Sequence, residues 1–165
     1  MELSVQEYNR IGEERYNAGD IEGAKEAFER AIAIDSKSSV GLNNLGIILL
    51  HEKNLDNAFL CFLKANAADA ANLNILSNLA TCGRELGLWA AVAGVLQHSL
   101  SFHPKNADLL FLLGTFYLKL GKKKEARQLL AECLRIQPEF SEASELISEL
   151  DGAGEMLEKT GEDLE

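Results

Sequence analysis

Residues 107–140, ADLLFLLGTFYLKLGKKKEARQLLAECLRIQPEF, decide the fold, because their pattern recurs three more times towards the N-terminus. Each copy is 34 residues long, and no insertion interrupts residues 5–140. Two columns twelve residues apart hold small residues in almost every copy: Gly12, Gly46, Ala80 and Gly114, then Ala24, Ala58, Val92 and Ala126. A repeat of this length with small residues at fixed positions is typical of helix-turn-helix units that stack to bury a shared core.

Apolar residues within each copy are spaced for amphipathic helices. In the fourth copy, Leu110, Leu113 and Tyr117 recur three and four residues apart, which places them on one helix face. The prolines, Pro104 and Pro138, lie between copies, where they end one helix and orient the next. We find no alternating strand pattern. The sequence therefore predicts eight helices in four units, residues 5–38, 39–72, 73–106 and 107–140.

The turn within each unit has its own signal. Glycine stands where the first helix should end in three copies, at Gly19, Gly87 and Gly121, and Lys53 holds that position in the second copy. Glycine adopts the left-handed backbone of a helix C-cap at little cost, so we expect that conformation at these positions. Lys53 is the residue that fits least well.

These residues resemble the pattern of the tetratricopeptide repeat (TPR) family. The fourth copy carries the likeness best, with eight positions that fit or nearly fit: Leu110, Leu113, Gly114, Tyr117, Ala126, Leu130, Cys133 and Pro138. Departures occur in the other copies, at Arg15, Ser36, Ala70 and Gly83, where we expect looser packing. The resemblance implies an all-α, right-handed superhelical solenoid.

The C-terminal part differs from the repeats. Ala143, Leu146, Ile147 and Leu150 form one apolar stripe, which predicts a capping helix over residues 141–150. Residues 151–165 lose this periodicity, and we interpret them as an acidic, mobile tail. Residues 139–165 hold ten acidic side chains and one basic side chain, so most of the net charge of −10 belongs to this segment.

Charge and composition restrict the partners and the compartment. Residues 1–138 lack the excess of lysine and arginine that nucleic-acid binding needs, apart from a local cluster at residues 119–127. No apolar run is long enough to span a membrane, and the N-terminus does not read as a signal peptide. Cys61, Cys82 and Cys133 form no disulfide or zinc pattern and read as small core residues. We expect a cytoplasmic protein with no nucleic-acid or membrane partner.

Motifs for catalysis are missing. His51, His98 and His103 share no metal-ligand spacing, and the glycines fall at helix contacts and helix ends rather than in a phosphate-binding loop. We therefore predict no catalytic residue, no cofactor and no metal site, and a protein that is not an enzyme.

The resemblance indicates which surface would bind a partner. In this family the first helix of each repeat lines a concave groove. Transferred position by position, the groove floor includes Glu13, Ser77 and Thr81, and its main candidates are Asn9, Tyr16, Asn43, Asn44, Ile47, Leu50, Asn74, Asn78, Arg84, Phe111, Thr115 and Leu118.

Two groups of groove residues can be interpreted chemically. Asn44 and Asn78, one repeat apart, either grip the backbone of an extended peptide or bond the neighbouring helix. Phe111 and Leu118 are apolar where the packing of a repeat does not require it. They mark either a partner site or a surface covered by another part of the chain. We expect their replacement by serine to weaken partner binding and to leave the fold intact.

Three functions compete at this stage. The first is a module that binds an apolar or extended segment of another protein, as a monomer. The second is a self-assembling scaffold, and the third is the accessory array of a larger enzyme such as a glycosyltransferase. The cations by which some TPR proteins hold a chaperone's C-terminal carboxylate are missing, and Glu13 stands at one of those positions.

Overall fold

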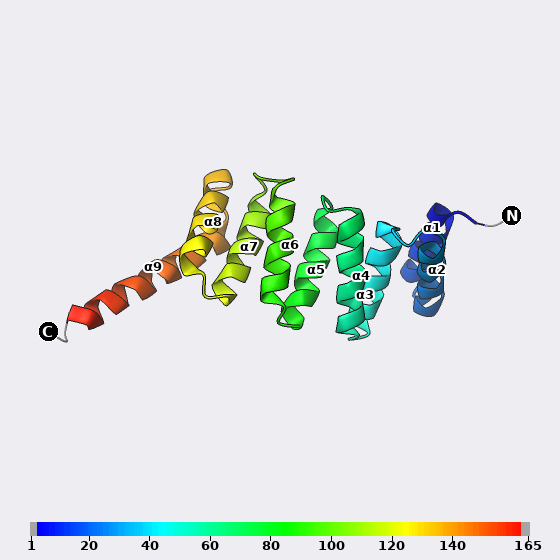
Figure 1. Cartoon of the computed structure of the whole chain (residues 1–165), viewed down its shortest axis with the longest axis horizontal. Helices are drawn as coiled ribbons and strands as arrows, with labels where there is room; N and C mark the ends of the chain where they lie inside the picture. The colour runs from blue at the N-terminus through cyan, green and yellow to red at the C-terminus, as the bar shows by residue number, and fades with distance from the viewer. Residues whose placement is uncertain (1–2, 163–165) are drawn as a thin grey trace. The chain divides into compact units, whose positions relative to one another are not determined.

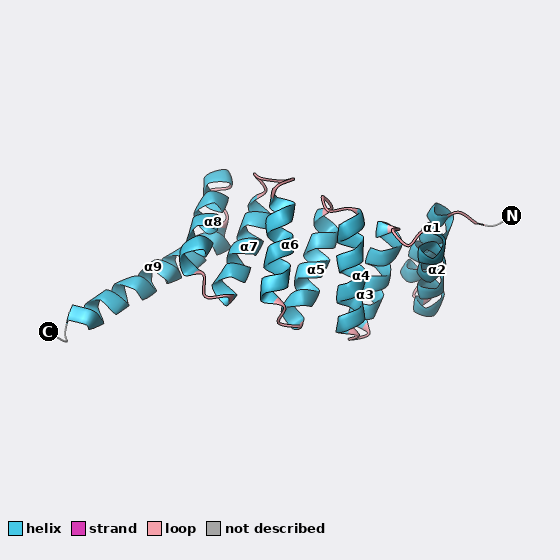
Figure 2. Cartoon of the chain, viewed as in Figure 1, coloured by secondary structure: helices cyan, strands magenta, loops and turns pink. Residues whose placement is uncertain are grey.

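A computed structural model describes residues 3–162, with side chains described for residues 3–152. Helices are the regular structure in this part of the chain, and no strand occurs in it (Figure 2). The helices are α1 (Val5–Asn17), α2 (Ile21–Ile34), α3 (Ser39–His51), α4 (Leu55–Ala68), α5 (Leu73–Glu85), α6 (Trp89–Leu100), α7 (Ala107–Lys119), α8 (Lys123–Ile136) and α9 (Ser141–Glu162) (Figure 1). They form two compact units, Met1–Leu88 with α1 to α5 and Trp89–Glu165 with α6 to α9.

Helices α1, α3, α5 and α7 begin 34 residues apart because a capping residue recurs with the same period. The capping side chains each accept a hydrogen bond from a backbone N–H of the first turn, and they are Ser4, Ser38, Asn72 and Asn106. Such a cap satisfies a donor that the helix itself leaves unpaired. Helices α1, α3, α5 and α7 thereby start at equivalent positions.

The turns behave as the sequence indicates. Gly19, Gly87 and Gly121 have φ values of 83°, 71° and 73°, and Lys53 has a φ of 61°. The predicted left-handed residue is therefore confirmed in all four turns. Lys53 has a Cβ that crowds the backbone in this conformation, and its ammonium group pairs with Glu85 of α5 at 3.4 Å.

In the first unit, an aromatic ring fills the space left by a glycine in each helical pair. Phe28 of α2 lies under Gly12 of α1, and Phe62 of α4 lies under Gly46 of α3. A Cβ at Gly12 would lie 2.5 Å from the Phe28 ring, and one at Gly46 would lie 2.7 Å from the Phe62 ring. These glycines therefore let the paired helices approach closely over a buried ring.

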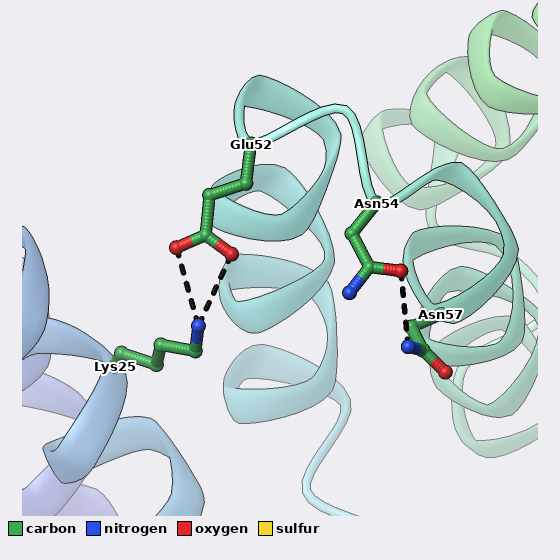
Figure 3. A network of polar contacts seen from close by, with 4 residues as sticks. All are labelled: Lys25, Glu52, Asn54 and Asn57. Atoms are coloured by element: carbon green, nitrogen blue, oxygen red, sulfur yellow. Dashed lines mark hydrogen bonds and ion pairs between the residues drawn. The ribbon is translucent and has the colours of Figure 1, made fainter.

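Polar contacts join the successive helical pairs of this unit at the surface. Lys25 of α2 donates to both carboxylate oxygens of Glu52, at 3.2 and 3.1 Å, beside the end of α3 (Figure 3). This hydrogen bond raises the pKa of Lys25. Asn54 precedes α4, but its side-chain oxygen accepts from Asn57 at 3.0 Å and does not cap the helix. Exposed contacts of this kind add little stability and mainly fix local geometry.

In the second unit, α9 covers the end of α8. Ala143 is fully buried with Leu110, Leu130 and Cys133, and Leu146 and other residues of the predicted stripe pack against this cluster. Beyond the stripe, the Arg127 guanidinium donates two hydrogen bonds to Asp151, at 2.7 and 3.0 Å. An apolar contact and an ion pair thus hold the first half of α9.

Helix α9 is longer than the sequence analysis predicts. It continues beyond residue 150 to Glu162, whereas we expected the helix to end at residue 150. Loss of an apolar stripe does not end a helix that is already nucleated. Alanine, glutamate, methionine and leucine favour its continuation, and they act against the helix-breaking tendency of Gly152, Gly154 and Gly161. The mobility expected for the tail stays a prediction, and residues 163–165 lie outside the described part of the chain.

The cysteines occupy the places expected of small apolar residues. Cys82 and Cys133 are buried, Cys61 is half-buried, and all three are free thiols. Burial raises the pKa of each thiol. The thiols are therefore protonated at neutral pH, in the less reactive form.

The glycine contacts predict an ordered series of stabilities. We expect Gly12→Ala and Gly46→Ala to destabilise the protein by about 1–3 kcal/mol, because each new methyl group displaces a buried ring. Gly94→Ala is the matched control, since a Cβ added there would meet no neighbouring helix or packed side chain within 4 Å. It should stabilise the protein by about 0.5–1 kcal/mol through helix propensity. Urea denaturation followed by circular dichroism measures the series, and equal effects at all three sites would contradict it.

The Arg127–Asp151 pair predicts a pH dependence. The hydrogen bond from Arg127 lowers the pKa of Asp151 below its ordinary value of 3.8. A lowered carboxyl pKa stabilises the folded state above the ordinary value, and this contribution is lost as the pH falls through the lowered value. We expect Asp151→Asn to lower the melting temperature at about pH 7 but not at about pH 2.

The control for this measurement is Glu149→Gln, which removes an exposed carboxylate from the same helix. Its melting temperature should follow that of the wild type at both pH values. A deficit in Asp151→Asn that persists unchanged at acidic pH would assign the effect to packing rather than to the ion pair.

Candidate functional site

A row of hydrogen-bonded polar side chains crosses the first unit from α1 through α3 to α5. Asn44 Nδ2 donates to Glu13 Oε1 at 3.4 Å, and Asn43 Nδ2 donates to Asn44 Oδ1 at 3.4 Å. Asn78 Nδ2 donates to Asn43 Oδ1 at 3.0 Å. We call these four residues, Glu13, Asn43, Asn44 and Asn78, the polar ladder. All four belong to the groove floor that the sequence predicts.

Buried neighbours fix the helices that carry the ladder. Leu42 of α3 and Ile75 of α5 are buried together with Ala65 of α4. Since these residues set the rotation of α3, the amides of Asn43 and Asn44 lie half-buried on the adjacent part of its surface. The ladder is therefore held by core packing rather than by a loop.

Two hollows lie along the ladder. The larger, of about 300 Å³, is lined by Glu13, Tyr16, Asn17, Phe28, Asn44 and Ile47. The smaller, of about 120 Å³, is lined by Glu13, Ser39, Val40, Asn43, Asn44, Asn72, Asn74 and Ile75. Glu13 and Asn44 line both hollows, so the two hollows meet at the α1–α3 end of the ladder.

The larger hollow has an aromatic and aliphatic floor. Phe28 is 1% exposed and belongs to a buried cluster with Ala24 and Ile48, against which Tyr16 packs. The Tyr16 ring is half-buried and supported from below. This hollow can therefore receive an apolar group, with polar atoms at its rim.

Other predicted groove residues of this unit have different surroundings. Asn9 Nδ2 donates to Ser38 Oγ at 3.1 Å, so it supports the cap of α3, and its side-chain oxygen is buried without a hydrogen-bond partner. Asn74 is exposed and lines the smaller hollow. Leu50 and Arg84 lie outside both hollows.

The predicted groove residues of the second unit are engaged within their own unit. Phe111 and Leu118 pack against the buried cluster under α9, and the ring centroids of Phe111 and Phe140 are 4.8 Å apart. Thr115 Oγ1 donates to the Leu112 carbonyl at 2.7 Å. The expectation that Phe111 and Leu118 take no part in packing is therefore wrong. The ring of Phe140, just before the capping helix, contacts Phe111, which agrees with the alternative that another part of the chain covers this surface.

The basic cluster of the second unit is also engaged. Lys119 Nζ lies 6.0 Å from the centroid of the Trp89 ring, and Lys122 Nζ lies 5.0 Å from that of Tyr117. Arg127 binds Asp151. Three of the cations therefore have partners inside the unit, which favours a structural interpretation of the cluster.

Sequence reasoning missed two residues of the larger hollow. The sequence pattern marks Phe28 as a core residue. Its position under Gly12 of α1 is the signal that could have indicated its second place, in the floor of the larger hollow. Asn17 follows Tyr16 at the end of α1 and carries no signal of its own in the repeat pattern.

Family comparisons agree with this architecture. Two family models described as tetratricopeptide repeat match residues 9–72 and residues 83–150, which together make up most of the chain. A solenoid of helical pairs with a groove-lining first helix is the structure that such repeats build. The chain belongs to the tetratricopeptide repeat family.

Solved structures show the same fold. Residues 41 to the end of MamA from Desulfovibrio magneticus RS-1 match with 15% identity, over 98% of this chain and 92% of that chain, at a TM-score of 0.76. YrrB, a TPR protein described as having an unusual peptide-binding site, matches with 18% identity, over 90% and 76%, at 0.75. PilF from Pseudomonas aeruginosa matches with 20% identity, over 92% and 69%, at 0.71. These matches confirm the all-α solenoid class.

Other searches returned nothing. A comparison with curated protein sequences finds no match. Within the described residues, no group of three or more histidine, cysteine, aspartate or glutamate side chains is arranged to hold a metal ion. No helix in that part of the chain has the length and apolar character needed to cross a membrane.

The packing of Phe111 and Leu118 predicts a loss of stability on their replacement. We expect the double substitution Phe111→Ser and Leu118→Ser to destabilise the protein by on the order of 3 kcal/mol, because it removes half-buried side chains from the core under α9. Urea denaturation measures the change.

The matched control is Phe102→Ser, which removes a phenylalanine that is 53% exposed in the same unit. It should change stability by less than about 1 kcal/mol, because its ring contact is edge-on with the exposed His98. If the Phe111→Ser and Leu118→Ser variant were as stable as this control, these side chains would contribute nothing to the core.

Proposed function

We propose that this chain is a non-catalytic interaction module that binds an extended segment of another protein along the polar ladder of its first unit. The observation that carries the proposal is the ladder itself, which places amides on two adjacent helices beside two recessed hollows. Backbone hydrogen bonds would supply affinity, and side chains of the ligand would enter the hollows.

The hydrogen-bond lengths suit an exchange of partners. The bonds from Asn44 to Glu13 and from Asn43 to Asn44 are each 3.4 Å long, beyond the usual range of about 2.7–3.2 Å. Weak bonds of this length cost little to replace with bonds to a peptide N–H or C=O. Asn78 Nδ2 makes the shorter bond, of 3.0 Å. Asn78 would therefore contact the ligand through its Oδ1, which can accept a hydrogen bond from a peptide N–H.

Apolar contacts would come from the larger hollow. Tyr16 and Ile47 are half-buried side chains that line it, and Phe28 forms part of its floor. A ligand side chain that covers these surfaces removes apolar area from water, which favours binding. Phe111 and Leu118 have no part in this proposal, because both pack against the buried cluster of the second unit.

Family membership supports the proposal in general terms. TPR proteins commonly bind proteins or peptides, and the YrrB structure is described by its peptide-binding site. We further propose that the chain acts as a monomer in the cytoplasm. The three free thiols are compatible with a reducing compartment.

The test uses peptides selected from a random library displayed on phage against the purified wild-type protein. We expect selected peptides to bind the Asn44→Ala, Asn78→Ala variant about tenfold more weakly than the wild type, because both amides contact the ligand backbone. Fluorescence anisotropy with labelled peptides measures the affinity. Methylation of peptide backbone nitrogens at the contact positions should weaken binding to a similar degree.

Asn57→Ala is the matched control, because it removes an exposed asparagine of α4 that belongs to neither hollow (Figure 3). Its affinity for the selected peptides should equal that of the wild type. Enrichment of no peptide, or equal binding to all three proteins, would refute a peptide site on the ladder.

A further inference from the structure

We infer that the larger hollow of the first unit takes an arginine side chain of the ligand, with Glu13 as its counter-ion. This inference rests on the proposed function and specifies which peptides the site would select. It follows from the charge, the aromatic surface and the hydrogen-bonding atoms that line the hollow.

Charge is the first reason. Glu13 is the one charged residue among those that line the larger hollow, and it lines the smaller hollow as well. The neighbouring cations of the unit have other partners, since Arg10 pairs with Glu14 and Lys25 pairs with Glu52. Among the described residues, Glu13 accepts a hydrogen bond of 3.4 Å from Asn44 and forms no ion pair with a lysine or arginine. Its carboxylate therefore meets the ligand as an uncompensated negative charge.

The remaining cation of α1 does not change this conclusion. Arg15 lies 3.9 Å from Asp20 and does not line the hollow that contains Glu13. It lines a separate depression between α1 and α2, together with Glu26 and Glu29. No basic side chain thus competes with a ligand cation for Glu13 within this hollow.

The aromatic surface is the second reason. Tyr16 lines the hollow three residues after Glu13, and the buried cluster of Ala24, Phe28 and Ile48 supports its ring. A guanidinium group is attracted to an aromatic ring and stacks on it readily. Its aliphatic stem would lie against Ile47, as long basic side chains do on apolar surfaces.

Hydrogen-bonding capacity is the third reason. The rim offers acceptors in the Glu13 carboxylate and the Asn17 and Asn44 amides, and no lysine or arginine among the lining residues. A guanidinium group donates five N–H bonds and accepts none, and it can bind a carboxylate through two parallel bonds. Arginine therefore matches the rim better than lysine, and an acidic ligand side chain would be repelled by Glu13.

Size agrees with a single side chain. A volume of about 300 Å³ is at the lower limit of small-molecule sites, which span about 300–1,000 Å³. The hollow continues into the ladder through Glu13 and Asn44, so a residue seated in it would remain joined to a backbone that contacts the amides.

The test uses N-acetyl-arginine amide as the probe, in an NMR titration of the isotope-labelled full-length chain. Its comparison probe is N-acetyl-citrulline amide, which has the same shape and no charge. We expect the arginine probe to shift the side-chain amide signals of Asn17 and Asn44 and the ring signals of Tyr16. The affinity of the citrulline probe should be about fivefold lower, because this probe lacks the ion pair and the cation–aromatic contact.

Variants of the two adjacent glutamates provide the matched pair. Glu13→Gln removes the carboxylate from the hollow, and we expect it to reduce the preference for arginine over citrulline to the part that the Tyr16 ring contributes. Glu14→Gln removes a carboxylate that pairs with Arg10 outside the hollow, and it should keep the full preference. Equal binding of both probes to the wild type, or a preference that is undiminished in Glu13→Gln, would overturn the inference.

The outcome can be separated from that of the proposed function. Selected peptides that need Asn44 and Asn78 but contain no basic residue would support the groove and refute the arginine pocket. Binding of the arginine probe without selection of any peptide would support the pocket and refute the extended peptide site. Peptides with arginine at one fixed position, weakened by Glu13→Gln, would support both.

Discussion

The close contact of a glycine with an aromatic ring is the constraint on which the first unit depends. Gly12 and Gly46 let α1 and α3 approach their partner helices over Phe28 and Phe62. Because each ring is buried at this contact, the rotation of the first helix in each pair is fixed. That rotation turns Asn43 and Asn44 of α3 away from the core, so the polar ladder is a consequence of how the two helices of each pair pack together.

Sequence reasoning works where the repeat itself imposes the structure. The left-handed residue at Lys53 follows from its column position, since equivalent positions in every copy have equivalent surroundings. The same periodicity predicts that Asn44 and Asn78 share a side, and the structure brings both into the polar ladder. What a single column cannot show is which atoms pair, because the ladder joins Asn78 to Asn43 rather than to Asn44, and that choice depends on how adjacent helices pack.

The repeat pattern predicts the structure less well where the array ends. Phe111 and Phe140 occupy the columns in which Asn9 bonds to Ser38 in the first copy, but in the last copy both residues are aromatic and pack together before the capping helix. The length of α9 is missed for a related reason. A helix that leaves the core needs no apolar stripe to continue, so its end has no strong signal in the sequence.

Phe28 has a consequence for how this protein would respond to a ligand. The same ring closes the contact between α1 and α2 and forms part of the floor of the larger hollow. A ligand in the hollow would contact the ring that packs α1 against α2. Ligand binding and the separation of α1 from α2 are therefore thermodynamically linked. A substitution at residue 28 would therefore change both the contact with Gly12 and the floor of the hollow, and an exchange that preserves the fold could still reshape the hollow.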